Sequence, residues 1–242
     1  MQAASILRFI FRQGPSAMTD TTDTPLQEIE IDMIADLSCP WSFIARKRLD
    51  AVLEMLDIPV RLRWYPYLLA ADIPPGGIPR KDWLAKTHGT PEQVEKALEP
   101  IRVAGLQDGI EFNFEAIEAQ PNTIDAHRLV RMSREAGKEH QMVGRLYELF
   151  FIEGKDIGDI DVLADAAAEL GVMDTFKARK VLESDRETDE VWQEIKEAHE
   201  LGVKRIPAMI MARKYAILGV EDPVTIAKTL QMVQAEAQLD TN

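Results

Sequence analysis

A strand, a helix and a second strand follow one another between residues 29 and 65, and this unit constrains the fold of the whole chain. The residues from Ile29 to Ala35 are predicted to form a short apolar strand. The next segment carries its apolar residues on one helical stripe as far as Pro59, and apolar and polar residues then alternate from Val60 to Tyr65, as in a strand with one buried face. Because a helical crossover joins strands that run in the same direction, the unit predicts a parallel pair within an α/β fold.

The turn between the first strand and the helix holds Cys39, the only cysteine of the 242 residues. Pro40 follows it, and proline is favoured at the first position of a helix. The unpaired N–H groups and the positive end of the helix dipole would then face the thiol and favour its thiolate form. The placement predicts a reactive cysteine, although a single cysteine also occurs as a small buried apolar residue.

Composition and charge exclude several classes of partner. The chain has 41 acidic and 28 basic residues, a formal net charge of −13, and no Lys/Arg-rich run suited to nucleic acid. No apolar stretch is long enough to cross a bilayer, so no membrane association is expected. One cysteine cannot form an internal disulfide, and the sequence therefore predicts a cytoplasmic location.

Residues 1–27 are expected to lie outside the fold as a disordered N-terminal extension. Arg8 interrupts the apolar run near the beginning of the chain, which makes a poor secretory signal. Met18 precedes a polar run and offers an alternative start.

The middle of the chain, residues 67–184, is predicted to be helical after a loop rich in proline and glycine. Thr90 and Gln93 have the spacing of a capping box, and Pro100 is expected to kink or break the helix that they begin. Four further helices are expected over residues 123–136, 138–153, 160–170 and 173–183.

From residue 185 the chain returns to an alternation of helix and strand. A helix is expected over residues 186–201, and two apolar runs, 207–211 and 214–218, are predicted to form a hairpin before a final helix that Asp222 begins. The order of elements, with the helical block removed, is that of thioredoxin. We therefore predict a thioredoxin fold built from residues 28–66 and 185–238, with a large all-helical insertion at residues 67–184.

Pro207 stands just before the third predicted strand. In thioredoxin-like folds a proline at this position is cis and faces the active-site cysteine. The preceding residue, Ile206, then presents a free backbone edge to an extended peptide or to glutathione. An ordinary proline at the start of a strand is the alternative interpretation.

Five motifs together indicate a family. The chain resembles the DsbA-like superfamily of thioredoxin folds, and within it the FrnE-like branch, next to the kappa-class glutathione transferases and 2-hydroxychromene-2-carboxylate isomerases. The resemblance spans residues 30–233. It rests on Asp36-Leu37-Ser38-Cys39-Pro40-Trp41-Ser42, Trp64-Tyr65-Pro66-Tyr67, Pro121-Asn122-Thr123-Ile124-Asp125-Ala126-His127-Arg128, Phe151-Ile152-Glu153-Gly154-Lys155-Asp156-Ile157-Gly158-Asp159 and the hairpin from Pro207 to Gly219.

The motif around Cys39 departs from that of the FrnE-like relatives, which typically carry C-P-W-C. Ser42 replaces the second, resolving cysteine, so a mixed disulfide on Cys39 must be resolved by glutathione or another outside thiol. The resemblance thus implies a thiol–disulfide oxidoreductase in which Cys39 exchanges, Ser42 assists and Pro207 positions the substrate. Its expected substrates are small disulfides and protein disulfides.

Further contacts with glutathione are implied by the resemblance alone. Glu221 stands nearest to the acidic residue that holds the γ-glutamyl amine in kappa-like relatives. The other proposed binding residues are Pro40, Trp41, Asn122, Lys204, Arg205 and Ile206. No metal is expected, because the histidines show no zinc-like spacing with carboxylates or with Cys39. A homodimer is one expected assembly.

Two other functions stay open from the sequence. The kappa-like relatives carry a pattern such as S-P-Y-S, whose first hydroxyl holds the glutathione thiolate. A glutathione-dependent transferase or isomerase of aromatic or polyketide-like molecules is therefore the first alternative, and a noncatalytic binding module is the second. His127 lies within a helical pattern and is interpreted as a structural histidine rather than a catalytic base, and Asp222 as a helix cap.

Overall fold

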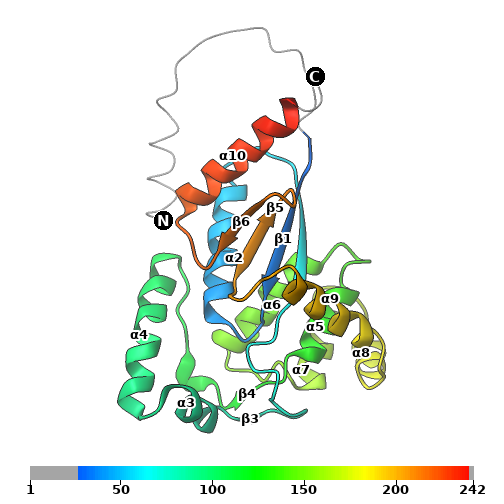
Figure 1. Ribbon diagram of the computed structural model, residues 1–242. Helices are drawn as coiled ribbons and strands as arrows, with labels where there is room; N and C mark the ends of the chain where they lie inside the picture. The colour runs from blue at the N-terminus through cyan, green and yellow to red at the C-terminus, as the bar shows by residue number, and fades with distance from the viewer. Residues whose placement is uncertain (1–26, 240–242) are drawn as a thin grey trace.

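A four-stranded mixed sheet forms the centre of the computed structural model, which describes residues 27–239 (Figure 1). β1 (Ile29–Ala35) lies parallel to β2 (Val60–Pro66), as the alternation predicts. β5 (Ala208–Met211) lies antiparallel to β1 and to β6 (Tyr215–Leu218), so the order is β2-β1-β5-β6. This is the sheet of a thioredoxin fold. The predicted N-terminal extension lies outside the described residues, apart from Gln27.

The helices are α2 (Pro40–Leu53), α3 (Arg80–His88), α4 (Pro91–Gln107), α5 (Ile124–Met132), α6 (Glu139–Phe151), α7 (Ile160–Glu169), α8 (Thr175–Leu182), α9 (Thr188–Glu200) and α10 (Pro223–Leu239). The helices α5 to α9 begin and end close to the predicted ranges, whereas α3 was not predicted as a separate helix. Figure 1 shows α3 to α8 gathered around the carboxyl end of β1, whereas α10 lies toward the opposite end of the sheet. Within the described residues, no helix is both long and apolar enough to cross a lipid bilayer.

The side chains of β1 divide the fold between the two faces of the sheet. Ile31 and Met33 pack into the main core with residues of α2, α10 and the insertion, which share one continuous apolar cluster. Ile34, on the other face, packs in a smaller cluster with Ala198 of α9. This division follows from the twofold period of a strand, because successive side chains point to opposite faces.

The insertion is helical, as predicted, apart from one small pair of strands and a short turn. Two short strands, β3 (Ile78–Pro79) and β4 (Ala119–Gln120), pair antiparallel within it, and residues 114–116 form a 3₁₀ turn. Neither strand was predicted, because two residues are too few to show a periodicity.

Pro100 lies inside α4 and does not break it, since the helix runs on to Gln107. The capping box that begins it is present, since Thr90 N donates to Gln93 Oε1 at 2.8 Å and Gln93 N donates to Thr90 Oγ1 at 3.4 Å. Packing maintains the helix beyond the missing N–H. Gly105, after the proline, lies so close to Phe112 that an added Cβ would come within 2.5 Å of its ring.

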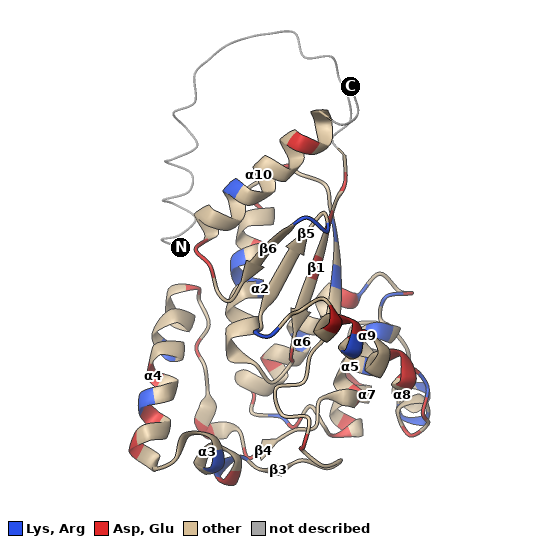
Figure 2. Cartoon of the chain, in the orientation of Figure 1, with Lys and Arg blue, Asp and Glu red and all other residues tan. Residues whose placement is uncertain are grey.

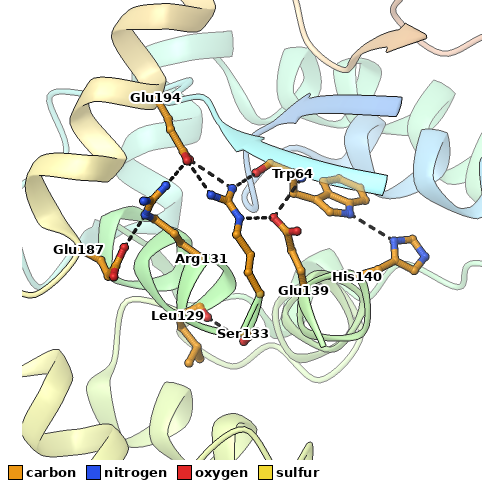
Figure 3. Close-up of polar contacts among 9 residues, drawn as sticks. Trp64, Leu129, Arg131, Ser133, Glu139, His140, Glu187 and Glu194 are labelled. Carbon is orange, nitrogen blue, oxygen red and sulfur yellow. Dashed lines mark hydrogen bonds and ion pairs between the residues drawn. The ribbon is translucent and has the colours of Figure 1, made fainter. Parts of the chain in front are cut away.

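A buried polar network ties the insertion to the sheet (Figure 3). Arg134 follows α5, and its guanidinium donates to Glu139 of α6 at 2.7 Å, to Glu194 of α9 at 2.6 Å and to the carbonyl oxygen of Trp64 in β2 at 2.6 Å. Glu139 also accepts from Trp64 N at 3.1 Å, and Arg131 pairs with Glu194. One arginine thus joins a strand of the sheet, the helix on its second face and the insertion.

The same network fixes the ring of His140. Trp64 Nε1 lies 3.2 Å from His140 Nδ1, and His140 Nε2 lies 2.8 Å from Asp50 Oδ1 in α2. Because an indole nitrogen can only donate, Nδ1 must accept, and the neutral ring carries its proton on Nε2 and donates it to Asp50. This bond joins α6 to the helix that carries the cysteine.

Candidate active site

Cys39 occupies the cap position of α2, as the sequence predicts. It has extended backbone angles, φ −94° and ψ 112°, and Pro40 begins the helix after it. Cys39 N donates to the carbonyl oxygen of Asp36 at 3.0 Å, and the Cys39 carbonyl oxygen accepts from Ser42 N at 3.1 Å. Phe43 anchors this end of the helix by stacking on Tyr147 of α6, with ring centroids 5.1 Å apart.

The register of the sheet brings the loop of Pro207 to the same end. Ile34 is paired with Ala208, so Pro207 lies beside the carboxyl end of β1, where the turn to Cys39 begins. The Ile206–Pro207 peptide bond is cis, the isomer that the fold class implies. Pro207 is buried and Ile206 is partly exposed.

The expectation of a stabilised thiolate is wrong for this structure. The Cys39 side chain is only 3% exposed, and its burial raises the pKa of the thiol from 9.0 to about 11. The charge of Asp36 adds to this rise, whereas contacts with Ser42 and with the backbone of Trp41 lower the pKa in part. Two pKa units correspond to about 3 kcal/mol. A helix N-terminus typically contributes about 0.3–1 kcal/mol, so desolvation prevails and the resting sulfur is a neutral thiol.

Neutral hydroxyl groups surround this thiol. The Ser42 Oγ is buried and has no hydrogen bond of good geometry among the described residues. The Tyr147 hydroxyl donates to the carbonyl oxygen of Asp36 at 3.3 Å, the same oxygen that accepts from Cys39 N. Burial raises the pKa of Tyr147 well above its usual value of 10. No local pattern identifies Tyr147 as a site residue, because it occupies an ordinary apolar position of a predicted helix.

Asp36 organises the turn before the cysteine. Its carboxylate is buried and accepts from Ser38 N at 2.9 Å, from Ser38 Oγ at 3.1 Å and from Leu69 N at 2.7 Å. An aspartate that bonds the backbone two residues on forms an Asx turn, so the Asp-x-Ser spacing was a usable signal. The turn holds Cys39 at the helix end.

The other residues predicted to contact glutathione lie on separate segments of the chain. Pro40 and Trp41 are partly exposed beside the cysteine, and Lys204 and Arg205 are exposed on the loop before Pro207. Glu221 is exposed, and its carbonyl oxygen accepts from Arg48 of α2 at 3.0 Å, away from the cap of that helix.

The Asn122 side chain makes hydrogen bonds within the fold. It donates to the carbonyl oxygen of Ile73 at 2.7 Å and accepts from Ile124 N at 3.0 Å. In the part of the chain that the structure describes, no group of three or more His, Cys, Asp or Glu side chains is arranged to hold a metal ion.

His127 is a buried, neutral histidine. Its Nε2 has no hydrogen-bond partner among residues 27–239, and burial lowers the pKa of the ring to about 4, although the charge of Asp36 opposes this effect. The unfolded chain therefore binds a proton at a higher pH than the folded one.

His127 should contribute to acid denaturation. Stability is expected to fall as the pH drops from about 6.5 through about 4, by up to about 3 kcal/mol from this residue. In His127→Gln this part of the pH dependence should disappear, as measured by urea unfolding at pH 7, 5 and 4. His88→Gln, at an exposed position, is the control. An unchanged slope in His127→Gln would contradict the assignment.

The fold and the placement of its thiol define a thioredoxin-fold protein with a single cysteine at the N-terminus of α2. The family model described as "DSBA-like thioredoxin domain" matches residues 30–231. The chain belongs to this family.

The chain is also similar to individual proteins. The chain is 27% identical over 188 residues to the uncharacterized protein YwbO of Bacillus subtilis (strain 168), covering 76% of this chain and 86% of that protein. The crystal structure of a probable DsbA oxidoreductase, SCO1869 from Streptomyces coelicolor, superposes with a TM-score of 0.78 at 20% identity, covering 86% of this chain and 91% of the other.

An isomerase has a similar fold as well. The structure of a 2-hydroxychromene-2-carboxylate isomerase superposes with a TM-score of 0.66 at 16% identity, covering 88% of this chain and 99% of that one. At these identities, the structural likeness establishes a shared fold.

Proposed function

We propose that this protein is a thiol–disulfide oxidoreductase in which Cys39 alone exchanges with the substrate. The observation that carries the proposal is the position of Cys39, at the cap of α2 and at the end of the sheet where the Pro207 loop lies. The family, which includes disulfide-exchanging enzymes, supports it. Ser42 and Pro207 flank the exchanging sulfur, and Ile206 pairs its backbone with the substrate.

The proposed cycle uses glutathione because the site holds one sulfur. The Cys39 thiolate attacks a mixed disulfide between a substrate thiol and glutathione, an S–S bond forms between Cys39 and glutathione, and the substrate leaves as a thiolate that takes up a proton. A second glutathione thiolate then attacks the bound glutathione sulfur. Cys39 is released and oxidised glutathione departs, so sulfur atoms and electrons balance.

Binding of the substrate must first make Cys39 reactive. The pKa of the thiol is raised chiefly by burial, so entry of a polar substrate or of water removes the main cause of the rise. The helix N-terminus and the backbone of Trp41 then favour the thiolate, and the proton passes to solvent. In this proposal the exposed Lys204 and Arg205 pair with the carboxylates of glutathione. A reduced thiol of this kind suits the cytoplasm.

Intact-mass measurement tests this function. Incubation with oxidised glutathione should give one glutathione adduct, which reduced glutathione removes and which is absent from Cys39→Ala. Ser42→Ala, a conservative change beside the sulfur, should still form the adduct. Failure of the wild-type protein to form a reversible adduct under native conditions, although it forms one when unfolded, would overturn the proposal.

A glutathione-dependent isomerase or transferase is the second candidate, favoured by the neutral state of Cys39. A thiol that keeps its proton can donate a hydrogen bond to the thiolate of bound glutathione, as a hydroxyl does. The similar isomerase fold is compatible with this role. Glutathione that stays bound noncovalently to Cys39→Ser, with turnover of an aromatic substrate, would select this function. The loss of both adduct and noncovalent binding would instead indicate a binding module.

A further inference from the structure

A cavity of about 320 Å³ lies on the face of the sheet that α9 covers. Its apolar wall is formed by Ile34 of β1, Ile210 of β5, and Ala198 and Leu201 at the end of α9. Cys39 does not line it. A volume of this size, with an apolar wall, is typical of sites for small molecules.

The polar side chains that line the cavity include more acidic than basic groups. Asp32, Glu197, Tyr65 and Arg213 line it, which gives two carboxylates and one guanidinium. Arg213 already pairs with Glu30 at 3.4 Å, outside the lining. Figure 2 shows further acidic residues along α9. The lining therefore leaves an excess of negative charge.

Asp32 carries the carboxylate that a bound ligand would pair with. Its carboxylate makes no hydrogen bond and no close ion pair with any residue between 27 and 239, and one of its oxygens is buried. Arg213, Arg63 and Arg61 act on it only from a greater distance, and burial still raises the pKa of Asp32. Burying a carboxylate without a partner is costly, and a cation that enters the cavity would repay part of this cost. Tyr65 also lines the cavity and has an aromatic ring and a hydroxyl group.

We propose that this cavity binds a small organic cation, a primary ammonium or amidinium group carried on an apolar or aromatic body. The cation faces Asp32 and Glu197, and its apolar body packs on Ile34, Ile210 and the ring of Tyr65. An anion would meet two carboxylates and an arginine that is already paired. The proposal is independent of the thiol chemistry at Cys39.

A pair of nearly isosteric probes tests the charge. By calorimetry at low salt, 2-phenylethylamine should bind with a Kd below about 1 mM. Binding of the neutral 2-phenylethanol should be at least about tenfold weaker. Asp32→Asn should weaken amine binding by about the same factor, whereas Glu200→Gln, an exposed carboxylate of α9 outside the cavity, should leave it unchanged.

A second variant tests the same charge effect in case Asp32→Asn does not fold. Leu201 is 72% exposed, so Leu201→Lys should fold normally and place a like charge at the mouth of the cavity, which should also weaken amine binding. Cys39→Ala should bind the amine as the wild type does, so this result is separate from that of the exchange reaction. Equal binding of amine and alcohol, no effect of Asp32→Asn in a folded protein, or no saturable binding of the amine would overturn the proposal.

Discussion

Replacing Arg134 with alanine is expected to lower the free energy of unfolding by about 3–5 kcal/mol. The reason is that Arg134 pairs with two buried carboxylates, those of Glu139 and Glu194, whose side chains are 9% and 11% exposed. Burial raises the pKa of Glu139 even with the arginine present. Removal of the guanidinium would leave both carboxylates, and the carbonyl oxygen of Trp64, short of a partner. Chemical denaturation at pH 7, followed by circular dichroism, measures the change.

Arg145 provides the matched control. It also pairs with two glutamates, Glu153 and Glu169, but their side chains are 40% and 54% exposed. Pairs of this kind contribute at most about 1 kcal/mol, so Arg145→Ala should shift the unfolding midpoint only slightly. If the two alanine variants proved equally stable, the network around Arg134 would not be what joins the insertion to the sheet.

The sequence predicts the sheet well because its signals are local. The alternation in β1 and β2 reports which face of each strand is buried, and the two apolar runs near the end of the chain gave the β5–β6 hairpin. Its turn residues, Ala212 and Arg213, have φ of 50° and 54°. Positive φ at both central residues is the geometry of a type I′ turn, which suits the twist of two paired strands.

The environment of the site was harder to predict, because it depends on tertiary packing. The position of Cys39 followed from a strand, a turn and a proline, but its burial depends on the insertion packed around α2. Tyr147 reaches the cysteine from α6, more than a hundred residues along the chain. The helix dipole alone therefore predicts the correct position for Cys39, at the start of α2, but the wrong ionisation state for its thiol.

The reactivity of Cys39 should reflect this burial. Iodoacetamide is expected to alkylate the native protein at pH 7.5 about a hundredfold more slowly than an unperturbed thiol, because a pKa of about 11 instead of 9.0 lowers the thiolate fraction by two powers of ten. The rate should keep rising with pH up to about 11. Ser42→Ala should slow alkylation further, since contact with Ser42 lowers the pKa of the thiol.

Stability gives an independent measure of the same titration. The folded protein holds the thiol proton more tightly than the unfolded chain, so the contribution is complete below about pH 9 and is lost as the pH rises through about 11. Cys39→Ala should remove this alkaline loss, which unfolding at pH 8 and pH 10.5 can measure. An alkylation rate that levels off near pH 7 would contradict a neutral resting thiol. It would show that the helix N-terminus outweighs desolvation, and that the site needs no substrate to activate its sulfur.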